Sequence, residues 1–258
     1  MVVRPSLYDS PLYYDILFGW DRDNEAERYE RLFQAHGVAE GGRVLELACG
    51  TGQIGRRLAA EGWQVTGLDW SSEMLAFLSE PAASAGVEVA TLQTDMTDFS
   101  SDLEDGPFAA AYCPMNSLGV LASEQVLVAH LRSAAASLQP NAPYVVDLST
   151  VEQQGPNEVG DGWSLERDGI EVRAAIDSGV PKVFVVDPAL DERLELSWGF
   201  DLSHTPEGFT ALVDQSAAFR IAAVHPEDGR DADGISTFAE TPLTKIPLGR
   251  SFVVLRRR

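Results

Sequence analysis

The sequence of 258 residues predicts an α/β fold, namely a doubly wound, mostly parallel sheet of seven strands with an antiparallel β insertion after the fifth strand. Two observations support this prediction. Short apolar runs alternate with helical segments over the first 150 residues, which is typical of a parallel sheet covered by helices on both faces. After Asp147 the pattern changes to period-two segments separated by turn residues, which is typical of antiparallel strands.

The elements before Asp147 follow from apolar periodicity and helix-start residues. An aromatic-rich segment from Tyr8 to Trp20 comes first, and a charged helical run from Asp23 to Ala35 follows it. We expect strands at 43–47, 64–68, 87–92, 108–112 and 143–147, and helices at 52–62, at 123–138 and from Ser71 or Ser72 to about Ser79. A serine suits the cap of the last helix, and Glu73 suits its first turn.

The second half of the chain completes the fold. Segments 170–176, 182–187 and 193–201 alternate with period two and are expected to form the inserted strands. Thr205 and Pro206 suit the start of a helix to about Ala217, and strands at 219–224 and 251–256 then complete the main sheet. We therefore divide the chain into a core at 1–150, a β insertion at 151–204 and a C-terminal completion at 205–258. Residues 226–249 stay unassigned, which leaves the order of the last strands open.

Composition restricts the partners. Nineteen basic and forty acidic residues give a formal charge of −21, which repels phosphate backbones and argues against nucleic acid or an anionic membrane. No segment has the length of a membrane span, and the first residues lack a secretory signal, so we expect a cytoplasmic protein. The oligomeric state is open between monomer and homodimer.

Cysteines and histidines give no metal-binding pattern. Cys49 and Cys113 lack the spacing of a zinc site or a disulfide framework, so we expect no metal. The four histidines are scattered and are expected to be surface or structural residues: His36, His130, His204 and His225. His130 falls in a helix that we expect at the surface.

A glycine motif at 43–55 is the most informative feature of the chain. A short apolar strand with Glu46 near its end leads into Gly50, Gly52 and Gly55, which have the spacing G-x-G-x-x-G. Glycines allow the backbone to approach a ligand, and the following helix presents free N–H groups, so this series indicates a nucleotide-type cofactor site. Asp69 ends the second strand 19 residues after Gly50, where an acid can hold a ribose hydroxyl. This spacing fits both NAD and S-adenosylmethionine.

Three features favour S-adenosylmethionine. Glu46 would repel a pyrophosphate but attract the ammonium and sulfonium of S-adenosylmethionine. Asp95 and Met96 follow the third strand, where a carboxylate can accept a hydrogen bond from an adenine amino group. About 40 residues precede the first strand, whereas dinucleotide domains commonly begin close to it.

The sequence resembles the class I S-adenosylmethionine-dependent methyltransferases, in their small-molecule branch, over roughly residues 8–150. The resemblance rests on the runs at 46–52, 65–75, 94–99 and 113–118. It implies a Rossmann-like fold and a cofactor site made of Glu46, Ala48, Gly50, Gly52, Asp69, Trp70, Asp95, Met96 and Pro114. Glu46 and the glycine turn would hold the methionine moiety, and Asp69 both ribose hydroxyls. Trp70 would pack on the adenine or else be an ordinary packing residue, and Asp95 and the Met96 N–H would meet the adenine edge.

The resemblance also implies how the reaction is supported. Methyl transfer depends mainly on in-line positioning and removal of water. Asn116 would line the sulfonium end, and Tyr13 and Tyr14 of an N-terminal helical lid would remove a proton where the acceptor requires it or would simply pack. The inserted strands would cover the acceptor, with Trp163, Trp198, Phe200 and Phe209 as candidate lining residues.

The resemblance thus predicts methyl transfer to a nitrogen, oxygen or carbon atom of a small molecule. Three alternatives stay open. The chain can be an enzyme of the same fold that cyclises the aminobutyrate chain of S-adenosylmethionine and releases methylthioadenosine. It can be a catalytically silent cofactor-binding partner, or an NAD-dependent oxidoreductase.

Overall fold

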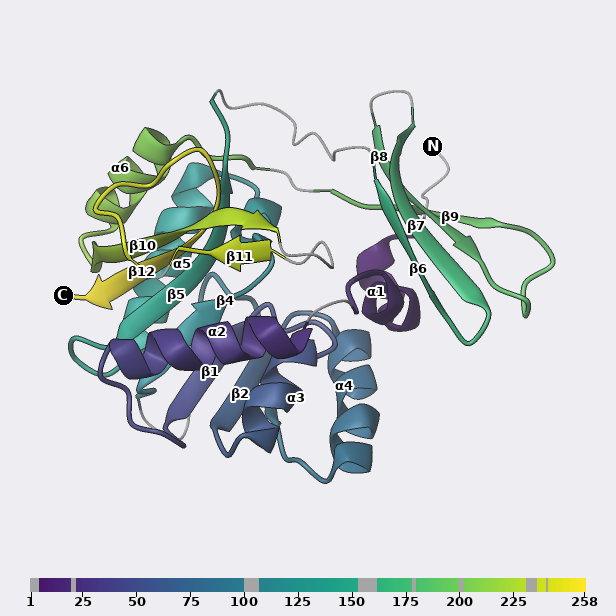
Figure 1. The fold of residues 1–258 in the computed structure, drawn as a ribbon, viewed down its shortest axis with the longest axis horizontal. Helices are drawn as coiled ribbons and strands as arrows, with labels where there is room; N and C mark the ends of the chain where they lie inside the picture. Colours follow the sequence, from purple (N-terminus) through teal and green to yellow (C-terminus); the bar gives the residue numbers. More distant parts are fainter. Residues whose placement is uncertain are drawn as a thin grey trace.

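A computed structural model describes residues 5–19, 22–99, 107–152, 162–177, 180–199, 202–230, 236–239 and 241–258. Its centre is an eight-stranded sheet with the strand order β11-β10-β12-β5-β4-β1-β2-β3 (Figure 1). The strands are β1 (Arg43–Leu47), β2 (Gln64–Asp69), β3 (Ala90–Gln93), β4 (Ala110–Cys113), β5 (Pro143–Thr150), β10 (Phe219–Arg230), β11 (Ser236–Phe238) and β12 (Gly249–Arg257). Strands β1 to β5 are parallel, and β12 runs antiparallel between β5 and β10.

The seven predicted strands all belong to this sheet, so the predicted fold class is confirmed. The eighth strand, β11, lies in the segment that the sequence left unassigned and pairs with β10 at the edge of the sheet. Pairing of β12 with both β5 and β10 also resolves the order of the last strands. Val253 of β12 lies opposite Val146 of β5 in this register.

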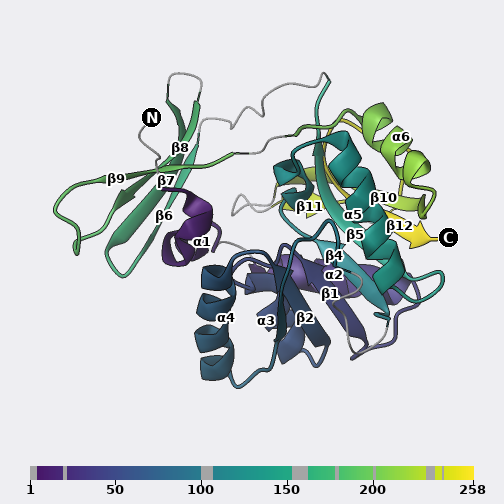
Figure 2. The same cartoon turned by 180° about the vertical axis from the view of Figure 1, so that it is seen from behind.

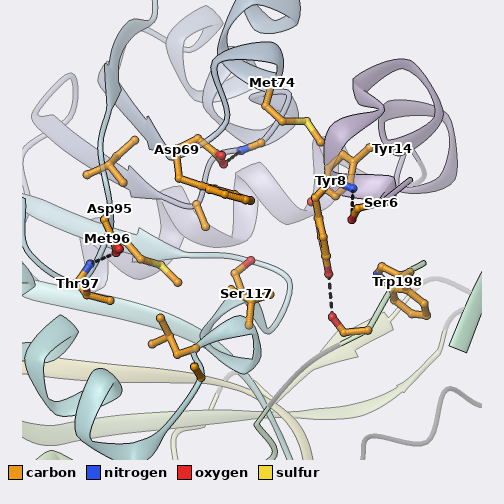
Figure 3. A pocket seen from close by; sticks show the side chains of 18 of the residues that line it. Ser6, Tyr8, Tyr14, Asp69, Met74, Asp95, Met96, Thr97, Ser117 and Trp198 are labelled. Atoms are coloured by element: carbon orange, nitrogen blue, oxygen red, sulfur yellow. Dashed lines mark hydrogen bonds between the residues drawn. The ribbon is translucent and has the colours of Figure 1, made fainter. Parts of the chain in front are cut away.

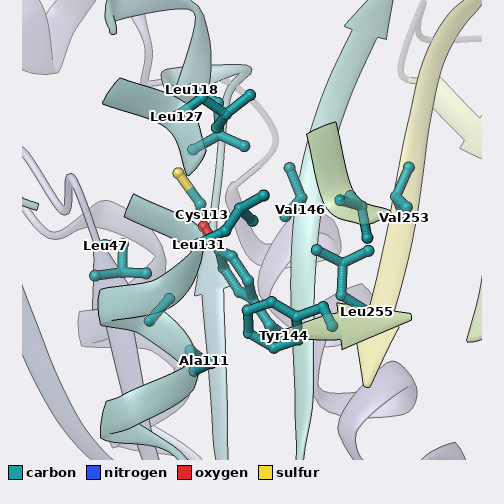
Figure 4. Close-up of a cluster of buried hydrophobic side chains, with 14 of the residues drawn as sticks. Leu47, Ala111, Cys113, Leu118, Leu127, Leu131, Tyr144, Val146, Val253 and Leu255 are labelled. Carbon is teal, nitrogen blue, oxygen red and sulfur yellow. The ribbon is translucent and has the colours of Figure 1, made fainter. Parts of the chain in front are cut away.

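Helices cover both faces of the sheet. Helices α2 (Arg22–Ala35) and α3 (Gln53–Ala60) pack on one face, and α5 (Glu124–Ser137) and α6 (Pro206–Ser216) pack on the other. Alternate strand residues serve the two faces: Val145 joins the cluster under α2 and α3, whereas Tyr144 and Val146 join the cluster under α5 and α6 (Figure 4). This alternation is the burial pattern of a doubly wound sheet.

Helix α4 (Ser72–Ala85) is longer than the sequence predicts. The Ser71 hydroxyl caps it by accepting a hydrogen bond of 3.2 Å from the Met74 N–H, as expected. Pro81 lies inside the helix without ending it, and the helix ends instead at Gly86, whose φ of +69° suits glycine. Because α4 continues to Ala85, β3 begins three residues later than the predicted strand.

A second, antiparallel sheet is inserted after β5. It consists of β6 (Trp163–Arg167), β7 (Ile170–Asp177), β8 (Val180–Val186) and β9 (Leu194–Ser197), each paired with the next. The sequence predicts β7, β8 and β9 but not β6. A short 3-10 helix, η1 (Leu7–Asp9), and helix α1 (Pro11–Leu17) lie between this sheet and the core (Figures 1 and 2). None of the helices in the described part of the chain combines the length and apolar character that crossing a bilayer requires.

Candidate active site

A pocket of about 800 Å³ opens at the carboxyl ends of β1 to β4, where open α/β sheets bind their ligands. Its size is that of a small-molecule site. Six of the predicted cofactor residues line it: Ala48, Gly50, Asp69, Trp70, Asp95 and Met96. The structure therefore brings together three segments, after β1, β2 and β3, that the sequence singled out separately.

Asp69 is held by the backbone of two neighbouring turns. Its Oδ2 accepts a hydrogen bond of 2.8 Å from the Gly50 N–H, and its Oδ1 accepts one of 3.0 Å from the Ser71 N–H. Gly50 has a φ of +53°, a left-handed conformation that suits glycine. Asp69 is 6% exposed, and burial raises the pKa of its carboxyl. The result is a fixed acceptor on the pocket wall.

Trp70 and the segment after β3 continue this wall. Trp70 is 68% exposed, so its ring is accessible to a ligand. Asp95 is exposed, and its Oδ1 accepts a hydrogen bond of 2.8 Å from the Thr97 N–H. Figure 3 shows Asp69, Asp95 and Met96 on one side of the pocket.

The buried His130 contacts the segment after β3, and the sequence did not predict this contact. Its Nδ1 lies 2.8 Å from the Met96 carbonyl oxygen, and its Nε2 lies 2.7 Å from the Tyr144 hydroxyl. Burial lowers the pKa of His130 to about 4, so the ring is neutral near pH 7. The expectation of a surface helix was wrong at this position because His130 lies on the face of α5 that packs on the sheet.

The opposite wall comes from the N-terminal segment and the inserted sheet (Figure 3). The Tyr14 ring lies over the glycine turn, and its Cε1 is 3.2 Å from the position that a Cβ would take on Gly50. The Tyr8 hydroxyl donates a hydrogen bond of 3.0 Å to the Gly199 carbonyl, next to Trp198. Tyr8 and Trp198 lie 190 residues apart in the sequence, and no local sequence pattern predicts that they line the same pocket.

Glu46 lies beneath the glycine turn and does not line the pocket. It alternates with Leu45 and Leu47 in β1 and therefore faces α3, where it is 1% exposed. Its Oε2 sits 2.4 Å from the position that a Cβ would take on Gly55. Burial raises the pKa of Glu46 to about 8, so the carboxyl is largely neutral at pH 7. The expected contact of a carboxylate with the methionine moiety does not fit this geometry.

The predicted residues after β4 serve the loop rather than the pocket. Asn116 adopts a φ of +54°, and its Oδ1 accepts a hydrogen bond of 3.0 Å from the Ser149 N–H of β5. The buried Pro114 places its carbonyl 2.6 Å from the Ser117 hydroxyl oxygen. Ser117, at the start of η3 (Ser117–Val120), is the residue of this loop that lines the pocket.

Two further predicted site residues do not line the pocket. Gly52 has a φ of +68° and precedes α3, with Leu78 packed so closely that a Cβ would clash. The Tyr13 hydroxyl points elsewhere and donates a hydrogen bond of 2.9 Å to Asp187 Oδ2.

The four aromatic residues predicted to line the acceptor site differ in where they lie. Trp198 lines the pocket, and Trp163 packs edge-on against it while its Nε1 donates to the Leu17 carbonyl. Phe209 instead belongs to the core under α6, and Phe200 lies outside the described residues.

The residues present fit S-adenosylmethionine. The glycine turn brings the Ala48 and Gly50 backbone to the pocket, and the absence of a Cβ on Gly50 makes room for the Tyr14 ring. The Asp69 carboxylate, the exposed Trp70 indole and the Asp95 carboxylate follow one another in the order that a ribose and an adenine require. Among the described residues, no group of three or more His, Cys, Asp or Glu side chains is placed to hold a metal ion.

The fold is similar to that of class I, S-adenosylmethionine-dependent methyltransferases. Residues 44–141 match the model of the methyltransferase domain family. The chain is 37% identical over 111 residues to the putative methyltransferase YqeM of Bacillus subtilis, which covers 43% of this chain and 44% of YqeM. It is 33% identical over 137 residues to a dTDP-3-amino-3,6-dideoxy-alpha-D-glucopyranose N,N-dimethyltransferase of Streptomyces fradiae, which covers 52% of this chain and 51% of that protein. The chain thus spans about half the length of these relatives.

Solved structures share the fold over nearly the whole chain. An S-adenosylmethionine-dependent methyltransferase from Clostridium acetobutylicum superposes with a TM-score of 0.68 at 14% identity, covering 94% of this chain and 95% of that one. DesVI of Streptomyces venezuelae superposes with a TM-score of 0.65 at 22% identity, covering 91% and 97%.

Proposed function

We propose that this chain transfers a methyl group from S-adenosylmethionine to a small-molecule acceptor. One observation carries the proposal: Asp69 and Asp95 lie on one wall of a pocket that Trp70 also lines, and the opposite wall includes Tyr14 and Trp198. The first wall suits a nucleoside. The second comes from other parts of the chain and leaves space for an acceptor.

The cofactor would be held by residues that follow β1, β2 and β3. Asp69 would accept hydrogen bonds from the ribose hydroxyls, and Trp70 would pack on the adenine. Asp95 and the Met96 N–H would bind the adenine edge, and the backbone of Ala48 and Gly50 would lie against the methionine moiety. When bound, S-adenosylmethionine supplies a methyl group on a sulfonium, which is open to attack by a neutral nucleophile.

The chain's own contribution is positioning and exclusion of water. Tyr14 covers the glycine turn, and Tyr8 is oriented by its hydrogen bond to Gly199. Ser117 and Trp198 line the same pocket and would contact the acceptor.

We further infer that the acceptor atom is an amine nitrogen. Relatives named as N-methyltransferases support this choice, among them the Streptomyces fradiae enzyme and a glycine/sarcosine N-methyltransferase of Parasynechococcus marenigrum. A cytoplasmic location, a reaction without metal and an acceptor other than nucleic acid complete the proposal. The charge of −21 supports the last of these.

Calorimetric titration of the full chain with S-adenosylhomocysteine and with NADH tests the cofactor assignment. We expect one S-adenosylhomocysteine per chain and no heat of binding from NADH. Binding of NADH without binding of S-adenosylhomocysteine would support the oxidoreductase alternative and contradict the proposal.

A further inference from the structure

Asp15 of α1 joins three parts of the molecule that the sequence places far apart. Its side chain is buried, with 4% of the residue exposed. Its Oδ1 accepts a hydrogen bond of 2.7 Å from Gln53 Nε2 and lies 3.6 Å from Arg56 Nη2, both in α3. Its Oδ2 accepts a hydrogen bond of 2.7 Å from Arg167 Nη1 in β6 of the inserted sheet. A single carboxylate therefore connects α1, α3 and β6.

Helix α1 meets the inserted sheet through apolar contacts. Leu17 and Phe18 share one buried cluster with Val172 and Val183, which is separate from the clusters of the core. The Trp163 Nε1 adds a hydrogen bond of 3.1 Å to the Leu17 carbonyl. Continuous apolar burial makes α1 and the inserted sheet one packed unit.

Asp15 meets the core through polar contacts instead. Gln53 Nε2 donates both to the Asp15 carboxylate and, at 2.8 Å, to the Asp15 backbone carbonyl. Two guanidinium groups, of Arg56 and Arg167, converge on the same carboxylate. Without that negative charge the two cations would repel one another across the boundary between α3 and β6.

This contact lies directly beside the cofactor side of the pocket. Gln53 is the first residue of α3 and follows the glycine turn, and Tyr14 precedes Asp15 and lies against Gly50. We propose that Asp15 is a positioning residue that fixes the unit of α1 and the inserted sheet on α3, and so holds Tyr14 over the glycine turn. Its effect on cofactor binding rests on the proposed function, whereas its effect on the coupling of the two parts does not.

Hydrogen–deuterium exchange of the full chain without ligand tests the coupling. Asp15→Asn removes the charge at nearly constant shape, and we expect roughly tenfold faster exchange in segments 11–17 and 50–56. Strand β12 in the core provides the internal reference and should be unchanged. Asp9→Asn is the matched control, because Asp9 is an exposed acid of the same N-terminal segment. Wild-type exchange of both segments in Asp15→Asn would overturn the proposal.

Arg167→Gln provides a second variant if Asp15→Asn does not fold. It removes only the contact between Asp15 and β6, so we expect faster exchange in 163–167 and 11–17. Unchanged exchange in both segments would likewise overturn the proposal.

Titration with S-adenosylhomocysteine then links the contact to the cofactor site. Asp15→Asn should bind it roughly tenfold more weakly than wild type. Most of this loss should come from faster dissociation, which stopped-flow fluorescence measures. A merely structural role of Asp15 would lower the midpoint of thermal unfolding without changing the dissociation rate. Unchanged dissociation overturns the link to the cofactor site. If wild type does not bind S-adenosylhomocysteine but the exchange results hold, the proposed function fails and the coupling role of Asp15 stands.

Discussion

The Asp69 carboxylate accepts a hydrogen bond of 2.8 Å from the Gly50 N–H, which ties the end of β2 to the glycine turn after β1. A second hydrogen bond from the Ser71 N–H fixes its other oxygen. The carboxylate is therefore oriented before a ligand binds, which lowers the entropic cost of binding. The glycine turn contributes twice, because Gly50 makes room for the Tyr14 ring and its N–H orients the acid.

Replacing this acid tests the ribose assignment. Asp69→Ala should weaken binding of S-adenosylhomocysteine by about 1–3 kcal/mol, because buried hydroxyls lose their acceptor. Calorimetry measures the change, and Asp98→Ala serves as the control because Asp98 is exposed and does not line the pocket. Equal affinities of Asp69→Ala and wild type would refute the placement of the ribose.

Replacing Trp70 should affect cofactor binding but not the stability of the fold. Because its ring is exposed, Trp70→Ala should change the free energy of unfolding by no more than about 0.5 kcal/mol. It should nevertheless weaken cofactor binding by about 1–3 kcal/mol, the usual value of stacking between an aromatic ring and a base. Leu248→Ala, at another exposed apolar side chain outside the pocket, should change neither quantity. A large loss of stability in Trp70→Ala would instead indicate a packing role.

Asn116 is expected to act on stability through its backbone conformation. Asn116→Ala loses the hydrogen bond to Ser149 and pays about 1–2 kcal/mol for a left-handed backbone, whereas Asn116→Gly loses only the hydrogen bond. Urea unfolding should therefore rank wild type above Asn116→Gly and Asn116→Gly above Asn116→Ala. The ranking fails if alanine is as stable as asparagine at this position.

Glu46 predicts a specific pH dependence of stability. Its pKa is raised to about 8 in the folded protein, so the folded state binds a proton that the unfolded state releases above pH 4.5. This group's contribution is fully present below pH 4.5 and is lost as the pH rises to about 8, by about 1.4 kcal/mol per pH unit at most. The glutamine of Glu46→Gln stays neutral at every pH. The free energy of unfolding of this variant should therefore rise relative to that of wild type between pH 5 and 8, and the difference should stay constant above pH 8. Urea unfolding at a series of pH values measures this difference. A difference between the two proteins that does not change with pH would contradict a neutral Glu46 carboxyl.

The predicted site residues that line the pocket share a simple geometric cause. Gly50, Asp69 and Asp95 each follow an apolar strand, and the carboxyl ends of parallel strands meet at one edge of the sheet. Strand alternation could likewise have placed Glu46 beneath the turn, since its neighbours Leu45 and Leu47 face the other side of the sheet.

Other parts of the site depend on contacts between distant segments. Tyr8 reaches the pocket through packing of the N-terminal segment on the inserted sheet, and Trp198 reaches it from the end of that sheet. Asp15 meets Arg167 across 152 residues of sequence. Strand β11 has three residues, too few for a periodic signal.

The nucleoside product of the full chain tests the central claim most directly. We would incubate the chain with S-adenosylmethionine and a panel of amines, including amino sugars and glycine, and analyse the mixture by liquid chromatography and mass spectrometry. The proposed function predicts S-adenosylhomocysteine together with a methylated amine, both strongly reduced in Asp69→Ala. Methylthioadenosine without any methylated amine would contradict it and favour cyclisation of the aminobutyrate chain.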